Sequence, residues 1–417
     1  MAIQHTDVLV VGAGPAGLAS AIELKRLGVA RVTVVEREPE AGGTPRLCHH
    51  TGFGVWDFHR LYSGPSYARR YVQQARAMGV ELRTATTITH WEGESTLAYT
   101  SPQGIGAIEA RAILLATGVR ERPRAARLVP GYRPQGVFTT GSLQRFVDEH
   151  RLPVGTQAVI VGAESVSLSA FMTLISAGLK VSAFVTALPR HQIYFPYTPV
   201  KWWLVDLMKR TPIHTSTRVG SLLGPRRVEG VQIVHHESGR QEIIPCDTVV
   251  FTGDWIPEHE VARKGGLQVD PGTLGPQVDG QFRTSLPGVF AAGNLLRGAE
   301  TAATSAMEGR LAARGIADFL QGAPWPSHRL AIEAESPITW VFPNSIAVDD
   351  VSSRPRHVSF RVSQFVHKGT VQVQQGRKIL HTQRFRRLLP NETMRLPSAW
   401  LAQVDFHGAP PRLILAG

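Results

Sequence analysis

The chain has 417 residues, which is long enough for two or three domains with a sizeable hydrophobic core. Hydrophobic residues make up 43% and charged residues 19% of the sequence, and no apolar run approaches the roughly 18 to 20 residues of a membrane-spanning helix. The formal net charge of +12 indicates an acidic partner or an anionic ligand, but no recognition motif accompanies it, so nucleic acid is not expected as the partner.

The N-terminus and the cysteine content indicate where the protein is located in the cell and which cysteine chemistry it lacks. The first residues, MAIQHTD, contain no basic region, and the apolar stretch after them leads straight into a glycine turn. We therefore expect no signal peptide and a cytoplasmic protein. The two cysteines, Cys48 and Cys246, are far apart in sequence. This excludes a disulfide framework and an iron–sulfur cluster bound by cysteines of this chain alone.

The strongest local signal is a strand, a glycine-rich turn, a helix and a second strand over residues 8–36. In the turn, Gly12 permits the tight bend, Gly14 lets the backbone approach a pyrophosphate, and Gly17 lets the helix pack closely on the strand. The helix N-terminus adds free N–H groups and a positive partial charge. Glu36, at the end of the second strand, can accept hydrogen bonds from ribose hydroxyls. The segment predicts a dinucleotide-binding site.

Three later segments bear on which dinucleotide is bound. EREPEAGGTPR places a double glycine and then Arg46 shortly after the acid, and AILLATG carries a strand into Thr117-Gly118. TSLPGVFAAGN carries a short strand into Gly293-Asn294, ahead of a helix that starts near Thr301. In this order, the segments resemble the two-dinucleotide-domain flavoproteins related to thioredoxin and glutathione reductases, over about residues 6–320. The resemblance implies an extended FAD.

The same resemblance implies roles for particular residues. The turn from Gly12 to Gly17 would hold the pyrophosphate, Gly293-Asn294 would lie near the ribityl chain, and the helix from Thr301 would point its N-terminus at the pyrimidine edge of the flavin. The family usually has Asp where this chain has Asn294, so a hydrogen-bond acceptor is kept and a charge is lost. The residues expected to contact FAD are Gly12, Gly14, Pro15, Ala16, Gly17, Glu36, Arg37, Gly43, Thr44, Arg46, Ile88, Thr117, Gly118, Gly293, Asn294, Thr301 and Ala302.

A second nucleotide-binding unit is expected at about residues 151–252, where GTQAVIVGAESVSLSAFMTLISAGLKVSAFV predicts a strand, turn, helix and strand. Of the three glycines that such a turn needs, only Gly162 is kept, and Glu164 stands where the backbone should meet the pyrophosphate. The following strand lacks an acid that would bind an NAD ribose, and Arg190 is the only cation near it. Three interpretations stay open: a retained scaffold, which we favour, an NAD(P) site, or a site for another nucleotide.

Cys48, His49 and His50 follow the double glycine of the first unit. A redox-active cysteine pair is missing, which disfavours thiol–disulfide exchange through such a pair. Either histidine could act as a base that removes a proton from an amine or alcohol, or could instead anchor a loop. Cys48 is a candidate redox residue or a small buried side chain. Because the local spacing of the three does not suit zinc, no metal site is expected.

The longer segment GGTPRLCHHTGFGVWDFHRLYSGPSYARRYV carries a second, more specific resemblance. It is similar to flavin subunits of bacterial dye-linked dehydrogenases, which include the opine, hydroxyproline and cyanide-forming glycine dehydrogenases and relatives associated with glycerol-3-phosphate dehydrogenases. The resemblance implies oxidation of an amine or hydroxyl group by a flavin subunit that works with partners. Several members carry a C-terminal cysteine cluster for an iron–sulfur centre, which this chain lacks. The expected partner is therefore a second dehydrogenase or iron–sulfur subunit, or another acidic electron-transfer protein.

Aromatic residues are dense in RHQIYFPYTPVKWWLVDLMKR, where Tyr194, Tyr197, Trp202 and Trp203 would line a substrate entrance or, as we favour, a subunit contact.

After a proline-rich break near residues 323–328, polar and apolar residues alternate, which predicts strands. Between Arg354 and Arg395 the sequence has ten lysines or arginines, Arg356 among them, against one acid, Glu392. This basic region is either a solvated surface or a docking face for an acidic subunit or electron carrier.

These features predict an α/β protein with a Rossmann-like FAD domain, an inserted second Rossmann-like domain and a small C-terminal β-rich domain. The predicted boundaries are 1–150 and 253–325 for the two parts of the FAD domain, 151–252 for the insert, and 335–417 for the C-terminal domain. The predicted function is FAD-dependent oxidation of a small amine or hydroxy acid, with electrons passing to a partner, quinone or dye. The alternatives are an NAD(P)H-dependent flavin reductase and a non-catalytic flavin-bearing subunit of a hetero-oligomeric dehydrogenase.

Overall fold

The computed structural model describes residues 3–348 and 357–416, so Arg354 and Arg356 of the basic region lie outside the described residues. The chain forms two compact units. Unit 1 comprises residues 1–46, 52–120 and 257–417, and unit 2 comprises residues 47–51 and 121–256. Unit 2 therefore begins earlier in the chain than residue 151, and it includes a short segment from the N-terminal part.

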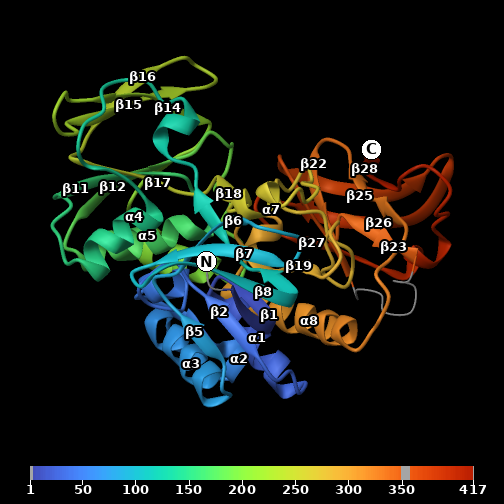
Figure 1. Cartoon of the computed structure of the whole chain (residues 1–417). Coiled ribbons are helices and arrows are strands. Elements are labelled where there is room, and N and C mark those ends of the chain that lie inside the picture. The colour runs from blue at the N-terminus through green and yellow to red at the C-terminus, as the bar shows by residue number, and fades with distance from the viewer. Residues whose placement is uncertain (1–2, 349–356, 417) are drawn as a thin grey trace. The chain divides into compact units, whose positions relative to one another are not determined.

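A seven-stranded sheet forms the centre of unit 1, with strand order β5-β2-β1-β8-β7-β6 and with β19 paired to the carboxyl half of β8 (Figure 1). The pairs among β5, β2, β1, β8 and β19 are parallel, while β6 and β7 add an antiparallel edge. The strands are β1 (Ile3–Val11), β2 (Val32–Val35), β5 (Glu81–Arg83), β6 (Thr87–Trp91), β7 (Thr96–Ser101), β8 (Gly104–Leu115) and β19 (Val289–Ala291).

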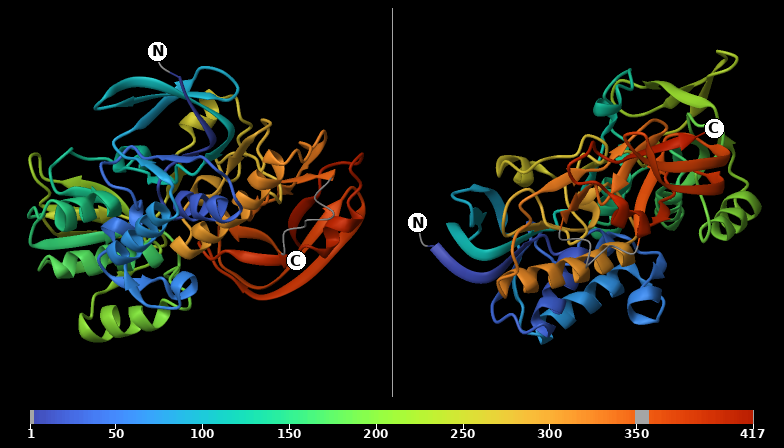
Figure 2. Two further views of the ribbon diagram at one scale, coloured as in Figure 1. Left: turned by 60° about the horizontal axis from the view of Figure 1, so that its bottom comes forward. Right: turned by 90° about the vertical axis from the view of Figure 1, so that its right-hand side faces the viewer.

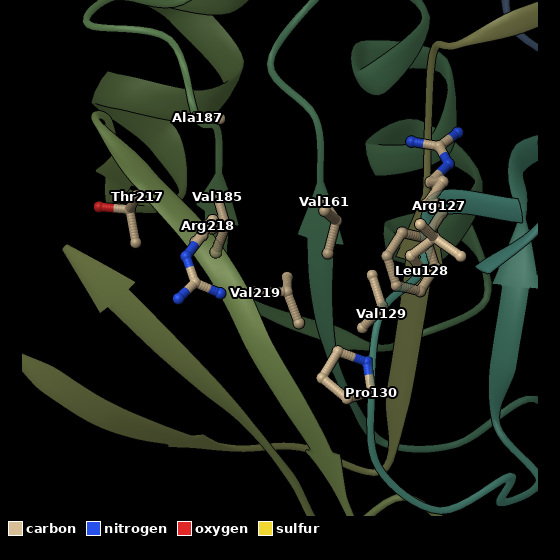
Figure 3. Close-up of a pocket in the computed structure, with 11 residues that line it drawn as sticks. Arg127, Leu128, Val129, Pro130, Val161, Val185, Ala187, Thr217, Arg218 and Val219 are labelled. Carbon is tan, nitrogen blue, oxygen red and sulfur yellow. The ribbon is translucent and has the colours of Figure 1, made fainter. Parts of the chain in front are cut away.

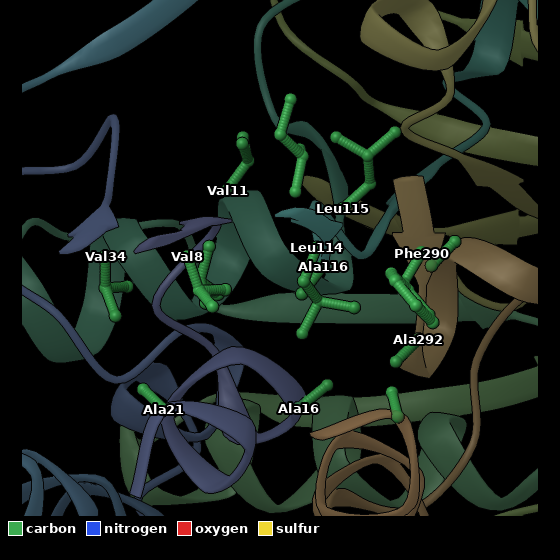
Figure 4. Close-up of a cluster of buried hydrophobic side chains, with 14 of the residues drawn as sticks. Val8, Val11, Ala16, Ala21, Val34, Leu114, Leu115, Ala116, Phe290 and Ala292 are labelled. Carbon is green, nitrogen blue, oxygen red and sulfur yellow. The ribbon is translucent and has the colours of Figure 1, made fainter. Parts of the chain in front are cut away.

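Small residues let two helices pack tightly against this sheet and each other. Helix α1 (Pro15–Arg26) contributes Ala16 and Ala21, which lie against strand residues such as Val8 (Figure 4). Helix α8 (Ala302–Leu320) runs beside α1 (Figure 2). The approach is so close that a Cβ on Gly309 would lie 2.0 Å from the carbonyl oxygen of Ala16. Helix α3 (Gly64–Ala77) also contacts α1.

Three of the parallel strands end at the same edge of the sheet. In the strand register Val11 of β1 and Ala291 of β19 both pair with Leu115 of β8. The loops that follow these strands therefore gather at one edge, which is where open α/β sheets bind their ligands.

In unit 2, a parallel five-stranded sheet of order β10-β17-β11-β12-β13 lies between the helices α4 and α5 and a three-stranded antiparallel sheet, β14-β15-β16 (Figure 1). The strand–turn–helix–strand pattern predicted for this region is confirmed by β11, α5 and β12. The elements are β10 (Val137–Thr139), α4 (Thr140–Gln144), β11 (Gln157–Val161), α5 (Ser165–Ser176), β12 (Lys180–Val185), β13 (Ile213–His214), β14 (Thr217–Leu223), β15 (Gly230–His235), β16 (Gln241–Pro245) and β17 (Thr248–Phe251).

The C-terminal part of unit 1 is β-rich, as the alternating pattern predicts. It has its own hydrophobic core, with Phe360 and Trp400 fully buried, and sheets of order β21-β28-β25-β26, β22-β24-β27 and β20-β23. The strands are β20 (Arg329–Ala331), β21 (Glu333–Ala334), β22 (Ile338–Phe342), β23 (Ser345–Ala347), β24 (His357–Val362), β25 (Val366–Gln375), β26 (Lys378–Leu388), β27 (Met394–Pro397) and β28 (Arg412–Ala416). The α/β architecture expected from the sequence is thus confirmed.

No helix among the described residues is both long and apolar enough to cross a membrane.

Candidate functional site

The first glycine turn is held tightly between β1, its neighbours and α1. The Gly12 N–H donates to the Val35 carbonyl at 2.8 Å. Gly12 has a φ of +107°, and a Cβ there would lie 2.4 Å from the carbonyl oxygen of Ala116. A Cβ on Gly17 would lie only 1.9 Å from the Gly12 carbonyl oxygen. Both residues are therefore glycine because the packing of the protein itself requires it.

Gly14 differs from these two. Its φ of −79° suits any residue, and a Cβ there would have no protein atom within 4 Å. The residue stands at the N-cap of α1, which begins at Pro15. The open space at this helix N-terminus is what a close pyrophosphate requires. The turn thus fits the diphosphate of a dinucleotide.

Glu36 lies at the end of β2, beside the turn. One carboxylate oxygen accepts a hydrogen bond from the Ala13 N–H at 2.8 Å, and the other accepts from the Glu38 N–H at 3.0 Å. Each oxygen keeps a lone pair that can accept a ribose hydroxyl. The Thr86 N–H donates to the Glu36 carbonyl, which brings buried Ile88 to the same end of the sheet.

The segment after the double glycine lies against the turn. A Cβ on Gly43 would be 2.7 Å from the Gly14 Cα. Thr44 opens the short helix η1 (Thr44–Leu47), and the largely buried Arg46 side chain pairs with Glu40 at 3.4 Å.

The remaining predicted residues after β2 and β8 differ in exposure and contacts. The side chain of Arg37 is 59% exposed, while the Thr117 hydroxyl donates to the Glu258 carbonyl at 2.8 Å. Gly118 has a φ of +76° and open space beside its Cα.

Gly293-Asn294 follows β19 and opens the short helix η5 (Gly293–Leu296), and the Thr301 hydroxyl caps α8, which begins at Ala302. The side-chain oxygen of Asn294 accepts from the Glu300 N–H at 3.0 Å and from the Ser305 hydroxyl at 2.9 Å. The Asn294 oxygen, which we expected to accept a hydrogen bond from the ribityl chain, thus already accepts two hydrogen bonds from the protein. This leaves the side-chain NH₂ group as a donor toward a ligand.

The sheet order fixes how a dinucleotide would run across these residues. Glu36 follows β2, so the ribose it can bind lies on that side of the turn after β1. The other half of the molecule would then extend over β8 toward β19, where Asn294 and the N-terminus of α8 stand at the same sheet edge. The partial positive charge of that N-terminus favours negative charge on the bound group.

The second turn, in unit 2, is arranged differently. Gly162 keeps a positive φ of +135° and follows β11 as Gly12 follows β1. Glu164 occupies the N-cap of α5, the position of Gly14 in the first turn. Its side chain is 7% exposed and folds back, so that a Cβ on Gly162 would be 2.8 Å from the Glu164 carboxylate and a Cβ on Gly253 3.2 Å from it. The space beside this turn is therefore occupied by a carboxylate of the protein.

We expect Glu164→Gln to stabilise the protein by about 1 kcal/mol at pH 8, because it removes the charge of a buried carboxylate, one oxygen of which has no hydrogen-bond partner. Burial raises the pKa of Glu164, against opposing effects of Thr252 and Arg127. The folded state therefore keeps the proton to higher pH than the unfolded state, and stability falls as pH rises above the unfolded value of about 4.3. Thermal unfolding midpoints should show a larger gain at pH 8 than at pH 5, and an equal gain at both would contradict the assignment.

A pocket of about 280 Å³ lies at the carboxyl ends of the unit 2 strands (Figure 3). Val161 and Val185 end β11 and β12 there, and Arg218 of β14 and Arg127 add positive charge. The Arg127 guanidinium donates to the carbonyls of Thr252 and Gly253 at 2.9 and 2.7 Å, which ties it to the turn that Glu164 fills.

The three candidate catalytic residues belong to unit 2, whereas the first glycine turn belongs to unit 1. The Cys48 thiol lies 3.8 Å from the side-chain oxygen of Gln144, and Gln144 donates to the Ser169 hydroxyl at 2.9 Å. His50 Nε2 is 2.8 Å from the same hydroxyl. Burial raises the pKa of the Cys48 thiol to about 12, although Gln144 and Ser169 act to lower it. Cys48 is therefore a thiol, and not a thiolate, at neutral pH.

His49 and His50 line a smaller pocket of about 180 Å³ with Asp148, and His49 Nδ1 lies 3.8 Å from the Asp148 carboxylate. Burial lowers the pKa of His50, which favours its neutral form. Within residues 3–348 and 357–416, no group of three or more potential metal ligands is found.

A set of buried charges next to Gly293 was not foreseen from the sequence. Glu308, on α8, accepts a hydrogen bond from the Gly293 N–H at 3.2 Å and pairs with buried Arg297. The only indication of this cluster in the sequence is that Glu308 lies on the apolar side of a predicted helix.

An open glycine turn on the mainly parallel sheet of unit 1, followed by a second turn on the parallel sheet of unit 2, is the arrangement of the two-dinucleotide-domain flavin oxidoreductases. The chain belongs to the pyridine nucleotide-disulphide oxidoreductase family, whose sequence model matches residues 6–309. Membership in this family, together with the thioredoxin reductase-like fold, confirms FAD as the cofactor and places the chain among flavin-dependent oxidoreductases.

Individual relatives agree with this assignment. One subunit of the opine oxidase of Agrobacterium tumefaciens (strain Ach5) is 27% identical over 338 residues, which cover 74% of this chain and 64% of that relative, less than two thirds of its length. Ferredoxin–NADP reductase of Thermus thermophilus is 25% identical over 304 residues, covering 71% and 86%. The crystal structure of T. acidophilum thioredoxin reductase shares the fold, with a TM-score of 0.63, 20% identity, and coverage of 76% and 99%. The two resemblances stated from the motifs are thus confirmed.

Proposed function

We propose that this chain is the flavin subunit of a dehydrogenase that oxidises a small amine or hydroxy acid and passes the electrons to a partner, quinone or dye. The observation that carries the proposal is the contrast between the two turns. The space beside Gly14 is open, whereas Glu164 fills the corresponding turn in unit 2. A phosphate there would meet a buried carboxylate, so NAD(P) is disfavoured as the electron carrier.

Different residues of the chain bind the cofactor and move the proton. When bound, FAD supplies the hydride acceptor, at the flavin N5. The turn around Gly14 and the N-terminus of α1 would hold its diphosphate, and Glu36 would orient the ribose. A proton must leave the amine or alcohol as its hydride departs, and His49 or His50 is the proposed acceptor of that proton. Neutral His50 is in the form that can take up a proton, but it would first have to give up a hydrogen bond, because Nε2 lies 2.8 Å from the Ser169 hydroxyl and Nδ1 lies 2.9 Å from the Thr51 carbonyl.

Anaerobic mixing with NADH or NADPH tests the proposed electron route. We expect neither nucleotide to bleach the flavin absorbance rapidly, whereas dithionite bleaches it fully. The matched substrate test mixes the oxidised protein with small amines and hydroxy acids, with a dye as acceptor. Rapid, saturable bleaching by either nicotinamide nucleotide would contradict the route and favour an NAD(P)H-dependent flavin reductase.

That second function has specific support. One relative is a ferredoxin–NADP reductase, and the 280 Å³ pocket of unit 2 carries Arg127 and Arg218 at the strand ends. The bleaching experiment separates the two functions. Turnover of a small substrate by the isolated chain would in turn exclude a non-catalytic flavin-bearing subunit.

The proposed partner is a second dehydrogenase or iron–sulfur subunit, or another acidic electron-transfer protein. The relative from Agrobacterium is itself named as one subunit of an oxidase. Strand β26 stands at one end of its sheet and exposes Lys378, Arg384 and Arg386, none of which forms an ion pair with another described residue. Trp202 and Trp203 of unit 2 are 62% and 54% exposed, as a subunit contact would require. The cytoplasmic location expected from the N-terminal sequence stays a prediction.

A further inference from the structure

Four charged side chains form a buried cluster where the C-terminal strands of unit 1 meet the start of α8. Arg297, Glu300, Glu308 and Arg361 are only 3%, 9%, 4% and 12% exposed. Two positive and two negative charges balance within the cluster. Such a group is expensive to bury, and apolar residues of similar volume would often join two elements at lower cost. Holding the two elements together is therefore not a sufficient reason for burying these four charges.

One side of the cluster belongs to the C-terminal strands. Arg361, on β24, donates to a carboxylate oxygen of Glu300 at 2.7 Å and to the Ala299 carbonyl at 2.9 Å. The hydroxyl of Thr393, just before β27, donates to the same Glu300 oxygen at 2.6 Å, and Arg361 Nε donates to that hydroxyl at 3.0 Å. Glu300, which precedes the N-cap of α8, is thus held by Arg361 of β24 and by Thr393, the residue before β27.

The other side of the cluster belongs to the strand end that faces the dinucleotide. The Glu300 N–H donates to the Asn294 side chain at 3.0 Å, and Glu308 accepts from the Gly293 N–H at 3.2 Å. Arg297 pairs with Glu308, lies 3.6 Å from Glu300, and stacks 4.0 Å above the Phe342 ring. A continuous set of contacts therefore joins Arg361 to Asn294 through Glu300.

We propose that Arg361 is a positioning residue of the flavin site, which acts through Glu300 to fix the Asn294 side chain and the N-terminus of α8. If the FAD ribose binds at Glu36, the flavin half would extend along the sheet edge toward these groups, because β19 lies on the far side of β8 from β1. A helix N-terminus held in place stabilises the negative charge that builds on a reduced flavin. The proposal rests on FAD binding to unit 1 and not on the substrate or electron acceptor proposed above.

The test compares Arg361→Met with Arg361→Lys by equilibrium titration of the bound flavin against a redox dye. The Met variant keeps the apolar stem but loses the donors to Glu300. We expect it to destabilise the reduced flavin about tenfold relative to the oxidised form, a shift of about 30 mV to more negative potential. The Lys variant should recover part of that shift, and the flavin absorption bands should move in the Met variant.

Arg310→Met is the matched control on the same helix. Arg310 follows Glu308 by two residues but pairs with Asp57 at 3.0 Å, outside the cluster, so its loss should lower the melting temperature without moving the potential. A folded Arg361→Met protein with the wild-type potential, or an equal shift in Arg310→Met, would overturn the proposal. If Arg361→Met does not fold, Thr393→Val decides, with a smaller shift of the same sign expected and an unchanged potential overturning the proposal.

Discussion

Replacing Gly14 with alanine is expected to yield a folded protein that has lost most of its affinity for FAD. The added methyl group has no protein atom within 4 Å, and the φ of −79° suits alanine, so the apoprotein should be undisturbed. The methyl group occupies the space that the diphosphate needs. A misfit of this size costs about 1–3 kcal/mol, which corresponds to roughly a 5- to 150-fold weaker Kd.

Flavin content after purification and FAD titration of the apoprotein measure this effect. Gly93→Ala is the control, because Gly93 is an exposed loop residue that also has no neighbour within 4 Å of a new Cβ. The control should keep a full complement of FAD. Wild-type affinity in the Gly14 variant would show that the diphosphate does not lie on this turn.

Gly17→Ala, three residues further on, should have a different result. Its new Cβ would lie 1.9 Å from the Gly12 carbonyl oxygen, so α1 or the turn must move. Neither can do so freely, because Gly12 is bonded to β2 and α1 is packed against Gly309 of α8. We expect a loss of about 3 kcal/mol or more of folding stability, with low yield of folded protein.

Thermal unfolding of the apoproteins separates this effect from loss of the ligand. The melting temperature of the Gly17 variant should lie well below that of the wild-type apoprotein, whereas that of the Gly14 variant should equal it. Equal melting of all three would mean that α1 can recede from β1 at no cost.

These two glycines also show what sequence alone could establish. A strand, turn and helix are neighbours in the chain, so the pattern around Gly12 and Gly17 specifies its own local geometry. The place of Glu36 could also be predicted, because it follows β2, the last strand of the same local motif. The loss of glycine at Glu164 was equally visible. The sequence did not show that this side chain folds back and becomes buried, because that depends on Gly253, far along the chain.

The features of the site that the sequence could not predict all depend on contacts between segments that are far apart in the chain. Arg361 and Glu300 lie on different elements of unit 1, and no period or motif links a basic residue on a predicted strand to a loop before a helix. Cys48 and His50 follow the double glycine after only a few residues, which suggested a place beside the flavin. Their packing onto Gln144 and Ser169 in unit 2 depends on tertiary contacts that local spacing does not encode.

The pairing of β19 with β8 has a consequence for how the protein is made. Synthesis from the N-terminus completes unit 2 at residue 256, before β19 at residues 289–291 exists, so unit 2 can fold first. Until then the carboxyl half of β8 is an open edge in the nascent chain, free to pair with other chains. The strand end that carries Gly293 and Asn294 is therefore synthesised only after unit 2 is complete, and a chain that stops before residue 289 leaves this edge of β8 unpaired.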